Sequence, residues 1–233
     1  MDMPKRIRRK HVSPTEIMTQ LGGVYGPLYW EPRYEPAFEL VSTILSQHTS
    51  DINSQRAFNN LLAEFETLDG IADGAVDEIA SAIRTGGLAN VKAARIKEVL
   101  LLVRKRVGSF DLSFLVEMPL AESKGWLKSL PGIGPKTAAI ILCFSLGMPA
   151  MPVDTHIFRV SKRLGLIGAK INADDAHDIL EPMVEPDDVF AFHMYLIEHG
   201  RRVCKAQRPR CEECVFEYIC PSRRLFKQTR NFK

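Results

Sequence analysis

Four of the five cysteines, Cys204, Cys211, Cys214 and Cys220, lie within 17 residues of a 233-residue chain, in the order Cys-x6-Cys-x2-Cys-x5-Cys. Chance clustering does not account for this density, and a group of thiolates is a typical set of metal ligands. Zinc ribbons usually pair two short Cys-x2-4-Cys units across a longer gap, whereas here one short unit has longer arms on both sides. The spacing therefore favours an iron–sulfur cluster, with one thiolate at each of four corners, and leaves structural zinc as the alternative.

Positive charge surrounds the same cysteines. Lys205, Arg208 and Arg210 lie in the six-residue arm between the first two cysteines. A metal that holds this arm rigid would present these cations to phosphates at a lower ordering cost than a flexible tail. The alternative is that they only offset the negative charge of the cluster, and both roles are compatible.

A lysine at the start of a predicted buried helix is the second candidate for chemistry. In the stretch LPGIGPK, residues 130–136, Gly132 and Gly134 flank Ile133 and allow a tight turn with exposed backbone N–H groups. Such a turn before a helix N-terminus can bind an anion. The positive end of the helix dipole would lower the pKa of Lys136 and raise its nucleophilic fraction. Taken alone, such a turn is more often a plain helix–helix connector, and such a lysine is more often an exposed side chain that extends to solvent.

Asp154 follows Lys136 by eighteen residues, in the stretch PVDTHIFRV. It precedes another predicted helix and has the side chain of a natural N-cap. A carboxylate held near a nucleophilic lysine could also accept a proton or stabilise a developing cation. Capping and chemistry are compatible roles.

The elements that must position these residues are helices. No run shows the sustained alternation typical of strands, and glycines or prolines separate the apolar runs. The sequence therefore predicts an all-α protein. The apolar runs at helical spacing are Leu40, Val41, Ile44 and Leu45; Phe58, Leu61, Leu62 and Phe65; Ala93, Ile96, Leu100 and Val103; and Ile157, Val160 and Leu164.

Composition indicates a folded protein, with 45% hydrophobic and 25% charged residues. No apolar run reaches the ~18 residues of a membrane span, and no signal-type apolar stretch follows the basic N-terminus. We therefore expect a cytoplasmic protein, nucleoid-associated in a prokaryote. Disulfides are uncommon in that setting, so the fifth cysteine, Cys143, is expected to be an inert buried thiol.

The net charge of +3 conceals an asymmetry along the chain. Residues 201–233 hold ten Lys and Arg against three Glu, and residues 1–12 add a net charge of about +4, so the central part is acidic. If the two ends meet in space, they form a positive face for a polyanion. The alternative is a pair of solvated tails.

Together these pieces resemble the endonuclease III family of DNA glycosylases, within the helix-hairpin-helix superfamily. The matching stretches LPGIGPKTA, PVDTHIFRV, HGRRVCKAQRPRC and the cysteine loop come in the family's order, and the likeness runs from about Ala37 to Cys220. The resemblance implies two helical lobes: a six-helix barrel lobe over 30–148, with the hairpin at about 128–148, and a [4Fe-4S] cluster lobe built from 1–29 and 149–233.

The resemblance also implies an activity. Lys136 would attack C1′ of a flipped nucleotide in double-stranded DNA, expel a damaged base and form a Schiff base, and β-elimination would then cut the strand. Asp154 would stabilise the sugar cation and assist proton transfer. The chain would thus be a monomeric bifunctional glycosylase and abasic-site lyase, acting on oxidised pyrimidines or abasic sites.

In the family a leucine and a glutamine fill the space that the flipped base leaves. These positions correspond to Leu88 and to the stretch LSQHTSD, where His48 takes the glutamine's place and Gln47 precedes it. The simpler alternative is that His48 caps the following helix. With the hairpin and the loop cations, the expected DNA-binding residues are Gln47, His48, Leu88, Gly132, Ile133, Gly134, Lys205, Arg208 and Arg210.

Two other functions remain open from the sequence. Residues 107–120 form a longer segment than in the shortest family members and resemble a subgroup that includes plant 5-methylcytosine glycosylases. A mismatch, alkylation or 5-methylcytosine glycosylase of the same fold is therefore the first alternative. The second, from another class, is a non-catalytic iron–sulfur protein that binds DNA or senses redox state.

Overall fold

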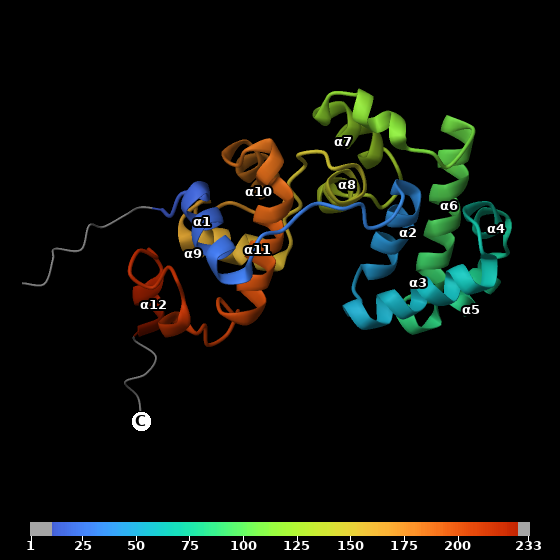
Figure 1. Ribbon diagram of the computed structural model, residues 1–233. Helices are drawn as coiled ribbons and strands as arrows, with labels where there is room; N and C mark the ends of the chain where they lie inside the picture. Colours follow the sequence, from blue (N-terminus) through green and yellow to red (C-terminus); the bar gives the residue numbers. More distant parts are fainter. Residues whose placement is uncertain (1–10, 228–233) are drawn as a thin grey trace, which may run out of the picture. The chain divides into compact units, whose positions relative to one another are not determined.

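The computed structural model describes residues 11–227, and regular structure within this range is entirely helical, which confirms the predicted all-α fold (Figure 1). The described residues form two compact units, one discontinuous in sequence. Unit 1 comprises residues up to Trp30 together with those from Met151, and unit 2 comprises Glu31–Ala150. The predicted basic stretch at residues 5–10 lies outside the described residues.

Unit 2 contains the following helices: α2 (Pro36–Ser46), α3 (Asp51–Phe65), α4 (Leu68–Asp73), α5 (Val76–Ala82), α6 (Ala89–Val107), α7 (Leu120–Lys128) and α8 (Pro135–Ile140), with 3-10 turns η1 (Arg84–Gly86) and η2 (Ser113–Glu117) and a π-helical turn η3 (Ile141–Ser145).

The core of unit 2 forms around α6. Its Ile96, Val99 and Val103 recur every three or four residues, so they lie on one face, and all three are fully or almost fully buried. Helices α2, α4 and α5 pack against α6. Gly108 ends α6 with a left-handed φ of 83°, directly after basic residues that suit the negative end of the helix dipole.

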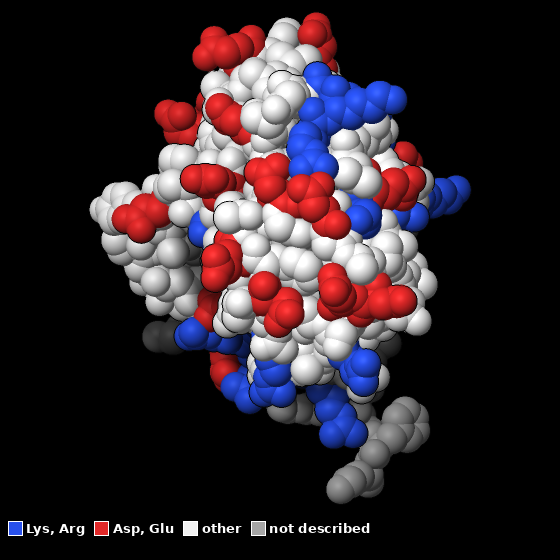
Figure 2. All heavy atoms as spheres, turned by 90° about the vertical axis from the view of Figure 1, so that its right-hand side faces the viewer, with Lys and Arg blue, Asp and Glu red and all other residues white. Residues whose placement is uncertain are grey.

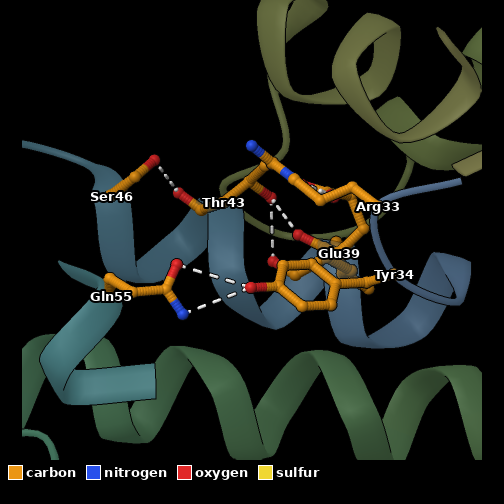
Figure 3. Close-up of polar contacts among 7 residues, drawn as sticks. Arg33, Tyr34, Glu39, Thr43, Ser46 and Gln55 are labelled. Atoms are coloured by element: carbon orange, nitrogen blue, oxygen red, sulfur yellow. Dashed lines mark hydrogen bonds and ion pairs between the residues drawn. The ribbon is translucent and has the colours of Figure 1, made fainter. Parts of the chain in front are cut away.

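A buried ion pair fixes the start of unit 2 (Figure 3). Glu39 of α2 is 0% exposed, and both of its carboxylate oxygens accept hydrogen bonds from Arg33, the one from Nε at 2.8 Å. The guanidinium also lies over the rings of Tyr34 and Phe144, and Arg33 N donates to Phe144 O at 3.2 Å. The first residues of unit 2 are thereby joined to η3, which lies near the end of that unit.

Unit 1 contains α1 (Pro14–Tyr25), α9 (Thr155–Leu164), α10 (Asp175–Leu180), α11 (Val189–Arg202) and α12 (Arg223–Lys227), with 3-10 turns η4 (Glu181–Met183), η5 (Pro186–Asp188) and η6 (Cys211–Glu213). Helix α11 packs against both α9 and α1. Tyr195 donates to Gly26 O at 2.7 Å, and Val12 N donates to Leu164 O at 2.9 Å. These contacts hold the N-terminal segment within the same unit as the C-terminal third of the chain.

Candidate functional site

A glycine turn connects α7 to α8. Gly132 has a φ of +74°, so the backbone of the turn favours glycine, and a Cβ there would also displace the end of the Arg95 side chain. Gly134 is extended and precedes Pro135, the first residue of α8. The buried Ile133 side chain anchors the turn, and Gln47 Nε2 donates to Gly132 O at 3.4 Å. The hairpin predicted from the sequence is therefore present, and one of the predicted loop residues contacts it.

Lys136 lies in the first turn of α8, and its side chain is exposed. The three residues that follow, Thr137, Ala138 and Ala139, are buried. The helix thus provides a rigid base from which the lysine extends outward. Directly after α8, η3 widens into a π-helical turn that contains Cys143, where burial raises the pKa of the thiol to about 12. Cys143 is 1% exposed, as the sequence predicts.

Asp154 caps α9. Its Oδ1 accepts a hydrogen bond from Ile157 N at 2.7 Å, which confirms the capping role expected of it. The preceding residues are held on three sides: Glu181 accepts from Met151 N at 2.9 Å, His177 Nδ1 lies 2.8 Å from Met151 O, and His193 Nδ1 lies 2.9 Å from Pro152 O. The carboxylate is therefore mounted on a fixed backbone in unit 1, while Lys136 belongs to unit 2.

Two exposed loops of unit 2 carry the residues expected to enter DNA. His48 and Leu88 both have left-handed backbones, with φ of 53° and 50°, although neither is glycine. Leu88 is 59% exposed, which is unusual for a large apolar side chain. The expectation that His48 caps α3 is wrong, because the cap is Ser50, whose hydroxyl accepts from Asn53 N at 3.4 Å.

The four clustered cysteines line one small cavity in unit 1, together with Arg163 and His199. Arg163 Nη1 lies 3.3 Å from Cys204 Sγ, and His199 Nε2 lies 3.6 Å from Cys214 Sγ. Burial raises the pKa of Cys214 to about 12 and also raises those of Cys211 and Cys220. Thiols in this environment become thiolates only when strong positive charge offsets the cost of burial.

Comparison with known proteins places these features in a family. The profile described as "HhH-GPD superfamily base excision DNA repair protein" matches residues 41–186. Endonuclease III of Sulfolobus acidocaldarius is 34% identical over 184 residues, covering 78% of this chain and 79% of that protein. The chain belongs to the endonuclease III family.

The likeness extends over most of the fold. Endonuclease III of Escherichia coli K12 is 32% identical over 207 residues, covering 88% of this chain and 93% of that protein. A solved structure of a non-covalent endonuclease III–DNA complex superposes with a TM-score of 0.78 and 25% identity, covering 94% of this chain and 100% of that one. This family member therefore has the helix-hairpin-helix glycosylase fold.

The arm between the first two cysteines of this family member is held by arginines from α9. Arg163 donates to Lys205 O at 2.7 Å and to Ala206 O at 3.0 Å, and Arg159 Nε donates to Cys204 O at 3.0 Å. Arg208, with a φ of 49°, is exposed in this arm, and Lys205 is half-buried. Arg210 pairs with Glu213 at 3.4 Å on the surface. The arm cations are predictable from the sequence, whereas the two arginines of α9 that hold their backbone are not among the predicted residues.

One face of unit 2 carries many acidic side chains. Figure 2, which views the molecule from the side where α4 and α6 lie in Figure 1, shows them spread over the surface, with lysines and arginines above and below them. Asp69 and Asp73 of α4 are among the exposed carboxylates and pair with Arg104. None of the residues expected to bind DNA belongs to α4 or α5.

Within the described residues, no helix is long and apolar enough to cross a bilayer.

Sequence reasoning also missed Lys92, a lysine of α6 that is only 4% exposed. The available signal was its position, because Lys92 lies four residues before Ile96 and so falls on the apolar face of the helix. Its contacts link the two exposed loops.

Proposed function

We propose that this chain removes damaged bases from double-stranded DNA and then cleaves the strand at the resulting abasic site, with Lys136 as the nucleophile. The observation that carries the proposal is the exposed amine on the first turn of a buried helix, directly after the glycine hairpin, in a chain that belongs to the endonuclease III family. A second lobe supplies Asp154 on a capped helix N-terminus.

The chemistry follows from an amine rather than a water as nucleophile. The Lys136 nitrogen forms a bond to C1′ as the glycosidic bond breaks and the base departs with a proton. The sugar ring then opens as O4′ takes up a proton, which gives an iminium ion whose nitrogen keeps its remaining proton. The iminium acidifies C2′–H, so removal of that proton expels the 3′ phosphate by β-elimination and cuts the strand. Asp154 stabilises positive charge on the sugar and takes part in proton transfer.

The remaining expected site residues hold DNA. The N–H groups of the hairpin at Gly132 and Gly134 would bind a phosphate, as would the cations of the cysteine arm. The Ile133 N–H donates to Leu130 O at 3.2 Å, so Ile133 would contribute by anchoring the turn through its buried side chain. Leu88 and His48, on their exposed loops, would fill the space that the flipped nucleotide leaves. Gln47 would hold the hairpin in place through its hydrogen bond to Gly132 O. Support comes from the exposure of the two loops and from the hydrogen bond between Gln47 and Gly132.

A [4Fe-4S] cluster fits the donor set in unit 1. Four half-buried cysteines line one cavity. Their spacing, with one short unit between two longer arms, suits a cluster with one thiolate at each corner better than a zinc ribbon. When bound, the cluster would supply a rigid cross-link for the arm that carries Lys205 and Arg208, with electron transfer as a further capacity.

The cluster assignment is tested by metal analysis of protein purified without added metal. We expect about four iron and four acid-labile sulfide per chain, and a loss of both in Cys211→Ser. The matched control is Cys143→Ser, which removes the one cysteine outside the cavity and should leave the iron content unchanged. One zinc per chain with no iron would overturn the assignment.

The function is tested on a panel of single-lesion duplexes, with oxidised pyrimidines, mismatches, alkylated bases and an abasic site, scored separately for base release and nicking. We expect release and nicking of oxidised pyrimidines, a loss of both of at least about 100-fold in Lys136→Gln, and a comparable loss in Asp154→Asn, which keeps an N-cap. Lys105→Gln, an exposed lysine on α6, is the control. Base release by the wild type without nicking would contradict the lyase and favour a monofunctional enzyme.

A further inference from the structure

The structure contains a buried lysine that connects the two exposed loops of unit 2. Lys92 Nζ lies 2.7 Å from Leu45 O, 2.7 Å from Thr49 Oγ1 and 2.9 Å from Gly86 O. An ammonium group has three N–H donors and no acceptor, so these three oxygens match its full capacity. The Thr49 hydroxyl also hydrogen-bonds to Gly86 O, which closes the network.

The three acceptors belong to two different loops. Leu45 is in the last turn of α2, three residues before His48, and Thr49 directly follows His48. Gly86 ends η1, two residues before Leu88. One side chain, carried by the first turn of α6, thus joins the backbones on which His48 and Leu88 are mounted.

This connection bears on an unfavourable backbone geometry. A left-handed conformation costs a non-glycine residue about 1–2 kcal/mol, so it persists only where the surroundings impose it. Both His48 and Leu88 have this conformation and both are exposed, so contacts of their own side chains with the core do not impose it. Lys92 and Thr49 donate hydrogen bonds to backbone carbonyls one to three residues before these positions, those of Leu45, Gln47 and Gly86, and thereby restrain the backbone.

The arrangement is costly for the lysine itself. Burial lowers the pKa of Lys92, because the charged form loses its hydration. An apolar side chain at this position would continue the buried face of α6 without that cost. The three directed hydrogen bonds of Lys92 therefore explain why a lysine stands at this buried position, because an apolar residue could not form them.

We propose that Lys92 is a positioning residue, which sets the two loops at a fixed separation so that His48 and Leu88 enter the duplex together. This inference rests on the proposed function, because it assigns a purpose to residues that would fill the space of a flipped nucleotide. Lys92 does not itself touch the reacting atoms. The loss of activity on replacing Lys92 should therefore depend on whether the substrate is a stacked duplex.

The test compares one lesion in two contexts, an abasic site within a duplex and the same site in a single strand, where there is no helix for the loops to open. In Lys92→Met we expect nicking of the duplex to fall by about tenfold or more, the effect of losing hydrogen bonds of this kind, while nicking of the single strand stays within about twofold. Lys97→Met is the matched control: Lys97 is on the same helix and also donates to backbone carbonyls, of Asp73 and Gly74, but not to the two loops. It should leave both substrates unchanged.

A second readout separates failure of this inference from failure of the proposed function. The fluorescence of 2-aminopurine beside the lesion reports unstacking on binding and requires no catalysis, and its rise should be smaller for Lys92→Met than for the wild type. If Lys92→Met does not fold, Thr49→Val takes its place, because it removes only the bridging hydroxyl. Equal losses on both substrates, or an unchanged fluorescence rise, would overturn the positioning role. Failure of the wild type to nick either substrate would overturn the proposed function instead.

Discussion

Glu39 is a carboxylate enclosed by the apolar core of unit 2, and a single residue, Arg33, neutralises it. Burial alone lowers the pKa of Arg33, but its hydrogen bonds to Glu39 and the charge of that residue raise it overall. The pair lies in the segment where the chain enters unit 2 (Figure 3). The ion pair thus holds the residues around Arg33, just before α2, against that helix.

Removing one member of this pair should destabilise the fold more than removing a surface pair. Arg33→Met leaves the Glu39 carboxylate buried and unpaired, so we expect the free energy of unfolding to fall by about 2–3 kcal/mol, less than for a fully buried pair because Arg33 is 47% exposed. Chemical denaturation monitored by circular dichroism measures the change. Arg104→Met, which breaks an exposed pair with Asp73, should cost no more than about 1 kcal/mol.

The double substitution Arg33→Met with Glu39→Leu provides the internal check. Because it removes the buried charge along with its partner, it should recover most of the stability lost in the single variant. A double variant as unstable as Arg33→Met would show that the loss comes from packing rather than from an unpaired carboxylate.

At the scale of elements, the α7–α8 turn depends on its two glycines in different ways. Gly132 has a positive φ, and a Cβ there would displace the end of the Arg95 side chain, whereas Gly134 is extended and has nothing within 4 Å of a Cβ. Gly132→Ala should therefore lower the free energy of unfolding by about 1–2 kcal/mol, and Gly134→Ala by less than about 0.5 kcal/mol. Equal effects in thermal unfolding would contradict the geometry of the turn.

The helices and this turn could be predicted because their signals are local. The spacing of Ile96, Leu100 and Val103 fixes a buried face, and Asp154 stands where a helix needs a cap. The contacts of Lys92 and Arg163 could not be predicted, because each joins segments far apart in the sequence. Arg163 reaches carbonyls more than forty residues away, and no periodicity within one helix encodes that partner.

The backbone of the 47–50 loop was outside the reach of sequence reasoning for another reason. His48 adopts a conformation that local preference disfavours, and the serine two residues later supplies the helix cap instead. A histidine before a helix is compatible with either role on sequence alone. The choice depends on the tertiary restraint from Thr49 and Lys92, which only the folded structure shows.

At the scale of the whole molecule, charge is distributed unevenly. Exposed acidic side chains are spread over the face of unit 2 that Figure 2 shows. The cations of the cysteine arm belong to unit 1. Binding to DNA should weaken steeply with salt, because each phosphate that a cation neutralises releases counterions. The number of phosphates that the arm contacts can therefore be measured from the slope of log K against log salt.

We expect Lys205→Ala combined with Arg208→Ala to reduce the slope of log K against log salt by about 2, one for each lost phosphate contact. Binding to an uncleavable abasic-site duplex, measured by anisotropy across a salt series, gives the slope. Arg104→Ala, a cation of α6 paired with Asp69 and Asp73, should leave it unchanged. An unchanged slope in the double variant would show that the arm does not contact phosphates.

The most direct test of the account is borohydride trapping on an abasic-site duplex, followed by mass mapping of the adduct. A Schiff base between Lys136 and C1′ would be reduced to a stable amine, so we expect one covalent protein–DNA adduct located on the peptide that contains Lys136. Lys136→Gln should give none, while Lys105→Gln should trap as the wild type does. An adduct that persists in Lys136→Gln, or that maps to a different residue in the wild type, would contradict the assignment of the nucleophile.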